Sequence, residues 1–219
     1  MIPIRDVIPS RTTPWVTLVL IGVNLAVFAY ELVLPEDAFR TFAREAGLVP
    51  AGFSWTAATT SLFVHGNLIH ISGNLVALWV FGENVEDQLG HGRYLAFYLA
   101  AGNAAALADV WATPQSTIPL IGASGAIAGV LGAYFVMFPR SRVLVLIPVF
   151  FFVDLVEVPA VLFAGIWFGL EVLGNVGRLA MPSVGGGAFW AHLGGLTAGL
   201  SLVALLRRPE RSRVEWWGA

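Results

Sequence analysis

Residues 121–131 read Ile-Gly-Ala-Ser-Gly-Ala-Ile-Ala-Gly-Val-Leu, and this stretch decides the predicted fold. In a helix, Ser124, Ala128 and Gly132 fall at i, i+4 and i+8, so they form one stripe of small side chains on the face of the serine. Such a stripe lets a second helix approach closely in lipid, where packing drives helix association. Taken alone, it indicates a packing surface, on which a serine commonly bonds the carbonyl one turn before it.

A second stretch, residues 191–199, has the matching pattern and adds a histidine. It reads Ala-His-Leu-Gly-Gly-Leu-Thr-Ala-Gly and places His192, Gly195 and Gly199 at i, i+3 and i+7 of a helix. If the two stripes pack together, Ser124 faces His192. Because an ionisable residue at membrane depth is expensive and marks a functional site by default, the pair favours a function over packing alone.

The composition places these helices in a membrane. Of the 219 residues, 57% are hydrophobic and 12% are charged, and the mean hydropathy is +0.77. Soluble domains average about 25% charged residues, so we predict an all-α polytopic membrane protein. The net charge of −2 offers no basic face, so no nucleic-acid partner is expected. The chain has no cysteine, which excludes thiolate metal sites and cysteine nucleophiles, and we expect no metal and no cofactor.

Six segments are expected to cross the bilayer as one domain over residues 15–206. The predicted spans are residues 15–34, 68–81, 94–111, 119–138, 160–173 and 189–206. The first is too long for a signal-peptide core and is expected to remain as a span. Residues 1–14 and 207–219 are expected to be cytoplasmic flanking segments.

The connections between the spans differ in character. Residues 35–60 mix charges with aromatic side chains and are predicted to lie in the membrane interface. Residues 83–88 are expected to form a polar link, and residues 174–187 a loop. Residues 143–153 are apolar but would reach only about 16 Å as a helix, so we expect an interfacial or re-entrant loop there.

Six spans put both termini on one side, and the arginines predict which side it is. Short cytoplasmic segments hold an excess of basic residues. With cytoplasmic termini, nine of the twelve arginines are inside, and the three outside are Arg40, Arg44 and Arg178. The second, fourth and sixth spans then all descend from the outer face. Four polar residues near their starts fall at similar depth: His70, Asn74, Ser124 and His192.

This set of side chains can perform acyl transfer. A serine becomes a nucleophile when a neighbouring base takes its proton, and His192 is the candidate base for Ser124. The carboxylates in or near the spans match the pair in neither spacing nor depth; they are Glu31, Asp109, Glu157 and Glu171. We therefore predict a Ser124/His192 dyad, with close helix packing supplying the orientation that an aspartate supplies in a triad.

Amide hydrolysis also needs donors for the developing oxyanion. His70 and Asn74 are four residues apart and share one helix face, and the backbone N–H of Ser124 lies at a helix start. Taken singly, His70 and Asn74 are equally well explained as hydrogen-bonding contacts between helices. The convergence of four polar residues on three helices favours a catalytic site. His65 is expected on the turn before the second span, and His91 in a solvated loop.

The motifs resemble those of the rhomboid family of intramembrane serine proteases. Gly-Ala-Ser-Gly at residues 122–125 is followed by Ala-His-x-Gly-Gly at residues 191–195, and the histidines and asparagine of residues 65–74 precede both. The resemblance implies a six-transmembrane-helix rhomboid-like bundle. It also implies Ser124 and His192 as catalytic residues, an oxyanion hole that involves His70, Asn74 and Ser124, and supporting roles for His65, Gly122, Gly125 and Gly195.

Two positions depart from the family pattern. Some members carry an aromatic residue one turn after the serine that stacks on the catalytic histidine, and here Ala128 stands in its place. Where some members have Glu-x-Arg after the second span, this chain has Glu86-Asp87-Gln88, which puts a salt bridge there in doubt.

The resemblance implies that the substrate is the transmembrane segment of a single-span protein, whose helix must unwind before attack. The alternative is a non-proteolytic rhomboid-like protein that binds client transmembrane helices. A transporter is disfavoured, because no internal repeat is evident and the histidines lie near one face. A chain rich in alanine and arginine but free of lysine suggests the inner membrane of a bacterium. The sequence does not indicate the oligomeric state.

Overall fold

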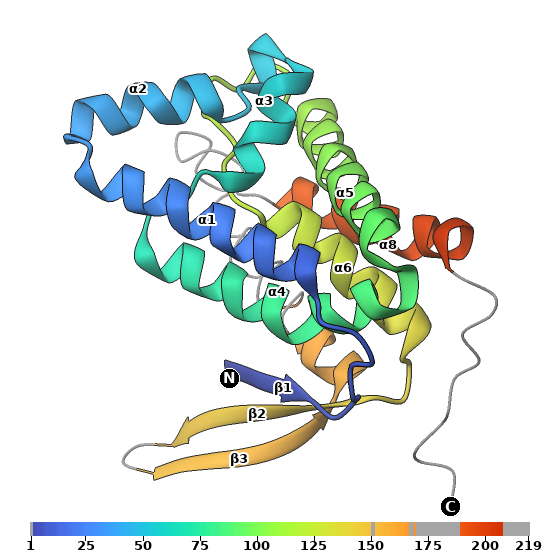
Figure 1. Ribbon diagram of the computed structural model, residues 1–219. Coiled ribbons are helices and arrows are strands. Elements are labelled where there is room, and N and C mark those ends of the chain that lie inside the picture. Colours follow the sequence, from blue (N-terminus) through green and yellow to red (C-terminus); the bar gives the residue numbers. More distant parts are fainter. Residues whose placement is uncertain (1, 150–151, 167–168, 170–188, 208–219) are drawn as a thin grey trace, which may run out of the picture.

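The computed structural model describes residues 2–149, 152–166, 169 and 189–207 (Figure 1). These residues form a bundle of helices with a small sheet beside it. The helices are α1 (Trp15–Val33), α2 (Glu36–Ala46), α3 (Trp55–Thr60), α4 (Leu68–Leu89), α5 (His91–Ala112), α6 (Ser124–Met137) and α8 (Phe189–Leu206). The strands are β1 (Ile2–Asp6), β2 (Arg142–Val149) and β3 (Phe152–Pro159). Two short 3-10 turns are Pro50–Gly52 and Ser61–Phe63, and residues 160–166 are helical.

Within the described residues, three helices are long and apolar enough to cross a membrane: α1, α5 and α8. A fourth span arises if residues 55–63 and α4, whose axes differ by 92°, are counted together. The apolar helix α6 is shorter. The chain is therefore an integral multi-pass membrane protein, and the predicted first and sixth spans agree with α1 and α8.

The six-span count stays a prediction. The predicted fifth span begins as a helix at residue 160, but most of its second half lies outside the described residues, as does the loop at residues 174–187. Two hydrogen bonds connect the ends of the described chain to the turn between α4 and α5. Asn84 in α4 donates to Asp6 at the end of β1, and Arg93 in α5 donates to the carbonyl of Leu206 at 3.4 Å. Residues 6 and 206 thus lie at the same end of the bundle, where α4 passes into α5.

The connector after α1 is itself structured and contains α2 and α3. Glu36 and Asp37 lie in the first turn of α2 and Arg44 in its last turn, where their charges complement the helix dipole. The rings of Tyr30 and Phe42 meet edge to face with centroids 5.5 Å apart, which packs α2 against the end of α1.

The predicted polar link at residues 83–88 is wrong, because α4 continues through it to Leu89. Glu86 is fully buried and accepts hydrogen bonds from the backbone N–H of Val16 and of Thr17, at 2.9 and 2.7 Å. These are N–H groups that the first turn of a helix cannot satisfy internally. The polar residues of this stretch therefore cap α1, and their polarity does not mark a loop.

His91 also differs from its expected place in a solvated loop. It is the first residue of α5, and its Nδ1 lies 2.6 Å from the carboxylate of Glu86. Gly90, with φ of +81°, makes the turn between α4 and α5. This tight turn brings His91 back onto the buried carboxylate.

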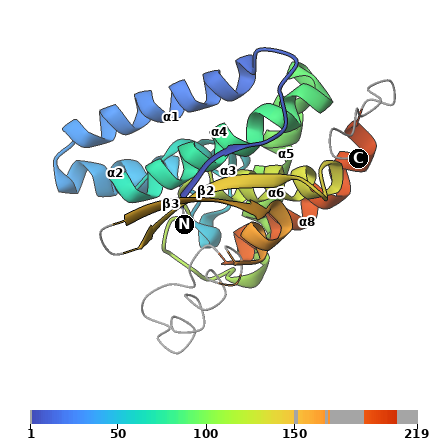
Figure 2. The same cartoon turned by 90° about the horizontal axis from the view of Figure 1, so that it is seen from below.

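The largest correction concerns residues 143–153, which were expected to form an interfacial or re-entrant loop. They belong to an antiparallel hairpin in which β2 pairs with β3 from Arg142 opposite Pro159 onward. Strand β1, from the predicted cytoplasmic N-terminal segment, pairs with the other edge of β2, so the sheet order is β1-β2-β3. Figures 1 and 2 show this sheet running alongside α4, with β2 starting near the end of α6.

A buried carboxylate joins this sheet to the helices. The side chain of Asp6 accepts hydrogen bonds from the amide of Asn84 at 2.6 Å and from the hydroxyl of Tyr134 at 2.7 Å. Its other oxygen accepts from the backbone N–H of Ile8. Burial raises the pKa of Asp6 from 3.8 to about 6, against the lowering effect of these hydrogen bonds.

The raised pKa of Asp6 predicts a pH-dependent stability. Because the folded state binds the proton more tightly than the unfolded chain, this stabilisation is fully present below about pH 3.8 and is lost as the pH rises through 6. The loss amounts to about 3 kcal/mol at most. Thermal unfolding midpoints in detergent should show wild type falling relative to Asp6→Asn between these pH values. A constant difference across this range would contradict the prediction.

Candidate active site

Helices α6 and α8 pack backbone to backbone, as predicted, but α6 does so through Gly125, Gly129 and Gly132 and not through the predicted stripe of Ser124, Ala128 and Gly132. A Cβ added to Gly195 would overlap the carbonyl oxygen of Gly125, and one added to Gly199 would overlap that of Gly129. A Cβ on Gly132 would lie 2.6 Å from the carbonyl oxygen of Leu196. Only glycine permits so close an approach at these positions.

The close packing sets Ser124 and His192 on facing turns. Ser124 is the first residue of α6, and the next residue, Gly125, faces Ala191, whose carbonyl oxygen would lie 3.7 Å from a Cβ at Gly125. His192 follows Ala191 in the first turn of α8 and is buried, with 5% of its surface exposed. Ser124 is half-buried. A half-buried serine and a buried histidine thus lie on neighbouring turns of the two helices.

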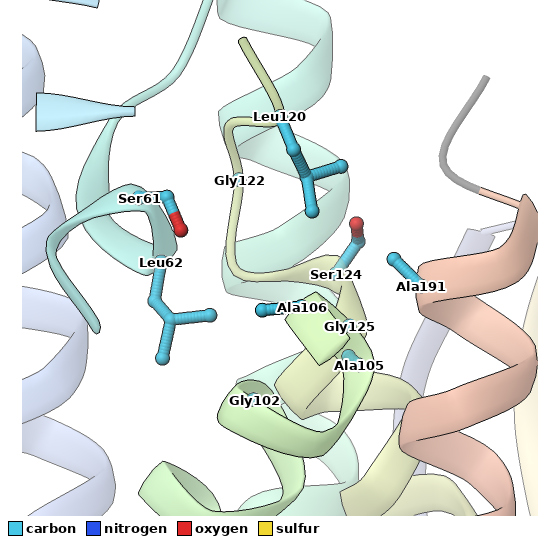
Figure 3. Close-up of a pocket in the computed structure, with 10 residues that line it drawn as sticks. All are labelled: Ser61, Leu62, Gly102, Ala105, Ala106, Leu120, Gly122, Ser124, Gly125 and Ala191. Atoms are coloured by element: carbon cyan, nitrogen blue, oxygen red, sulfur yellow. The ribbon is translucent and has the colours of Figure 1, made fainter. Parts of the chain in front are cut away.

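A small cavity lies next to the hydroxyl of Ser124 (Figure 3). Its volume is about 10 Å³, roughly the space that one water molecule needs. The serine side chains of Ser61 and Ser124 supply its polar atoms, and the wall is otherwise small or aliphatic. The lining residues are Ser61, Leu62, Gly102, Ala105, Ala106, Leu120, Gly122, Ser124, Gly125 and Ala191.

Gly122 brings the segment before Ser124 against His70. Its φ of +114° is a left-handed conformation that residues with a side chain rarely adopt. A Cβ at this position would also lie 2.6 Å from Nε2 of His70 and 3.7 Å from the side-chain nitrogen of Asn74. The structure therefore places His70 and Asn74 beside the chain that leads into the serine.

Asn74 is held by a chain of hydrogen bonds that begins on α1. Both carboxylate oxygens of Glu31 accept from the backbone N–H of His65, at 3.0 and 3.2 Å. Nδ1 of His65 lies 3.2 Å from the carbonyl oxygen of Phe63, so we assign the ring proton to Nδ1. Nε2 then accepts from the amide of Asn74 at 2.9 Å. His65 lies on the turn before α4, as predicted, and orients Asn74.

Helix α4 begins with a cap that orients His70. The side chain of Asn67 accepts from the backbone N–H of His70 at 2.9 Å, which satisfies one of the N–H groups left open at a helix start. The rings of His65 and His70 lie 5.1 Å apart between centroids. All three residues of the predicted His65, His70 and Asn74 group are thus gathered at one end of α4.

Two acidic residues in the helices were not expected near this site. Glu31 belongs to α1 and supports His65, as described above. Asp109 belongs to α5, is 5% exposed, and interacts electrostatically with His192. A carboxylate inside an apolar span is itself a signal of function, but neither its partner nor its depth can be read from the spacing of the motifs.

Among the described residues, no group of three or more histidine and acidic side chains could hold a metal ion. The polar groups near Ser124 are instead a hydroxyl, two imidazoles, an amide and a buried carboxylate. This set fits nucleophilic and acid–base chemistry at a serine.

The fold and site together define a multi-pass membrane protein with a serine at a helix start and a histidine on the facing helix. The Rhomboid domain family matches residues 52–209, most of the chain. The chain belongs to the rhomboid family.

Relatives from bacteria and mitochondria share this similarity. The chain is 31% identical to the rhomboid protease GluP of Bacillus subtilis over 77% of its own length and 29% of that protein. It is 31% identical to the mitochondrial rhomboid protein 1 of Saccharomyces cerevisiae over 58% of its length and 38% of that protein. The rhomboid protease AarA of Providencia stuartii is 31% identical over 53% of this chain and 48% of that protein. The chain thus spans less than half of each of these relatives.

Proposed function

We propose that this protein is an intramembrane serine endopeptidase with Ser124 as nucleophile and His192 as general base. The observation that carries the proposal is the packing of α6 on α8 through Gly125 and Gly195, which sets the two side chains on facing turns. The names of two relatives, both rhomboid proteases, support it.

The reaction follows from the positions of these groups. His192 takes the proton of the Ser124 hydroxyl as its oxygen attacks the scissile carbonyl, and the peptide bond breaks when the imidazolium returns that proton to the leaving amine. A water molecule then hydrolyses the acyl-enzyme, with His192 again as the base. The cavity beside Ser124 has space for one such water.

Three donors are proposed for the oxyanion. The backbone N–H of Ser124 belongs to the first turn of α6, where N–H groups lack helical partners. His70 and Asn74 lie across Gly122 from this turn. Because His65 accepts one N–H of Asn74, the other N–H stays available to a developing negative charge. Preorganised donors of this kind usually supply the largest catalytic effect.

We propose that the substrates are transmembrane segments of single-span proteins, cut near their outer ends. The site lies at the starts of α4, α6 and α8, whereas Asp6 and Leu206 lie near the opposite end, where α4 passes into α5. Because short cytoplasmic segments hold an excess of arginine, the predicted topology assigns this opposite end to the cytoplasm. Both termini are then cytoplasmic, with six spans between them. The inner membrane of a bacterium is the proposed location.

The experiment that tests this function is labelling with a fluorophosphonate, which reacts with activated serines. Purified wild-type protein in detergent should be labelled, and Ser124→Ala should not, because the hydroxyl that reacts is absent. Ser61→Ala is the matched control, since Ser61 lines the same cavity and its hydroxyl donates to the carbonyl of Ala58 at 3.0 Å. Equal labelling of Ser124→Ala and wild type would reject Ser124 as the nucleophile.

The alternative function is binding of client transmembrane helices without cleavage. An absence of labelling in a folded wild-type protein, together with retention of a single-span helix during purification, would favour it. The replacement of an aromatic residue by Ala128 on α6 is the feature that makes this outcome worth testing.

A further inference from the structure

We infer that Asp109 is a positioning residue, which holds and electrostatically supports the imidazole of His192 during catalysis. This inference rests on the proposed function, and it adds a residue of α5 to a catalytic pair that comes from α6 and α8. The buried carboxylate on α5 takes the place of the third member of a catalytic triad, although it comes from an element that contains none of the family motifs.

Helix α5 contacts α8 at the turn that carries His192. A Cβ added to Gly194 would overlap the Cβ of Ala108 and would lie 3.1 Å from the carbonyl oxygen of Ala104. One turn before Asp109, the Cβ of Ala105 lies 3.5 Å from a Cβ added to Gly195, which follows His192 by one turn of α8. Because α5 and α8 run antiparallel, with Arg93 beside Leu206, the next turn of α5 brings Asp109 to the turn of His192.

Asp109 is buried without a full set of hydrogen bonds. It is 5% exposed, and its Oδ1 is enclosed and has no hydrogen-bond partner among the described residues. Thr113 approaches it from the next turn, where its hydroxyl donates to the backbone carbonyl of Asp109 at 2.9 Å. A buried carboxylate with an open oxygen is costly unless a positive charge is near it. His192 is the group that can provide this charge when it takes the proton of Ser124.

The other helices around His192 offer no competing charge. Helix α6 has no charged side chain, and its face toward α8 consists of Gly125, Gly129 and Gly132. Within α8, residues 189–206, no residue other than His192 is ionisable. Within α5, Arg93 lies at the far end beside Leu206. In the described part of the chain, His192 is also the ionisable group that interacts electrostatically with Asp109.

The consequence for catalysis is a more stable imidazolium. An opposite charge a few ångströms away in a site of low dielectric favours the protonated histidine that forms as Ser124 attacks. The same charge restricts rotation of the imidazole, which the glycines of α6 cannot do because they have no side chains. Loss of the charge should therefore slow the chemical step and leave substrate binding unchanged.

The test compares Asp109→Asn and Asp109→Ala with wild type in liposomes that contain a single-span substrate. For both variants we expect kcat to fall about ten-fold with an unchanged KM, and the acid limb of the pH profile of kcat/KM to move about one unit toward lower pH. Asp109→Glu, which keeps the charge, should restore most of kcat and the wild-type acid limb. Asp37→Asn is the control, since it removes an exposed carboxylate from α2.

The outcomes separate this inference from the proposed function. The alanine variant introduces no bulk into the contact between α5 and α8, so it serves if the asparagine variant does not fold. A folded variant of either kind with wild-type kcat and an unmoved acid limb would overturn the positioning role. If Ser124→Ala still cleaved the substrate in the same liposomes, the proposed function itself would fail.

Discussion

Replacement of His192 by alanine is expected to lower the rate of substrate cleavage by on the order of 10⁴–10⁶, to the level of Ser124→Ala. Without the imidazole, no group on α8 can take the proton of the serine. The removal of both side chains should cost no more than the removal of either, because a nucleophile and its base act as one unit. Cleavage of a single-span substrate in liposomes measures all three variants.

The control for this experiment is a measurement of stability. His192 is buried, so its replacement leaves a small void, and the thermal unfolding midpoint of each variant in detergent must be compared with wild type. Additive losses in the double variant would show that Ser124 and His192 act independently, which would contradict the dyad.

The second large effect is expected from Gly195→Ala. The added methyl group would overlap the carbonyl oxygen of Gly125, so α6 and α8 must separate by a backbone shift. Overpacking of this kind costs about 3 kcal/mol, and a displacement of about 1 Å between a nucleophile and its base can cost 10²-fold in rate. We expect kcat to fall at least 10²-fold, with a lower unfolding midpoint.

Gly22→Ala is the matched control for this variant. Gly22 lies in α1, another apolar helix, and no atom lies within 4 Å of a Cβ added there. The same substitution should leave both activity and the unfolding midpoint close to wild type. Wild-type kcat in Gly195→Ala would mean that the close approach of α6 and α8 does not position Ser124 and His192.

The helices and the pairing of α6 with α8 could be predicted because their signals are local. The small residues recur at the spacing of one helix face, and the first and sixth spans are bounded by prolines, glycines and charges. The roles of Glu31 and Asp109 could not be predicted. Each acts on a residue far away in the sequence, and periodicity does not show which side chains meet across three helices.

The sheet was missed for a related reason. A valine-rich run such as residues 143–149 fits a short buried helix or a strand equally well. Its nature is decided by pairing with β3 and with β1, where Asp6 lies opposite Val143. The polar end of α4 was mistaken for a link because buried caps such as Glu86 have the composition of a loop.

The pairing of β1 with β2 also constrains how the protein is made. Strand β1 is synthesised before the helices, but its partner begins at Arg142, so it stays unpaired while α1, α4, α5 and α6 are synthesised. Contacts between such distant segments form late, because a long stretch of chain must be closed into a loop first. Residues 2–6 therefore remain an open strand edge during membrane insertion, and they join the sheet only after the helix that begins with Ser124 has been made.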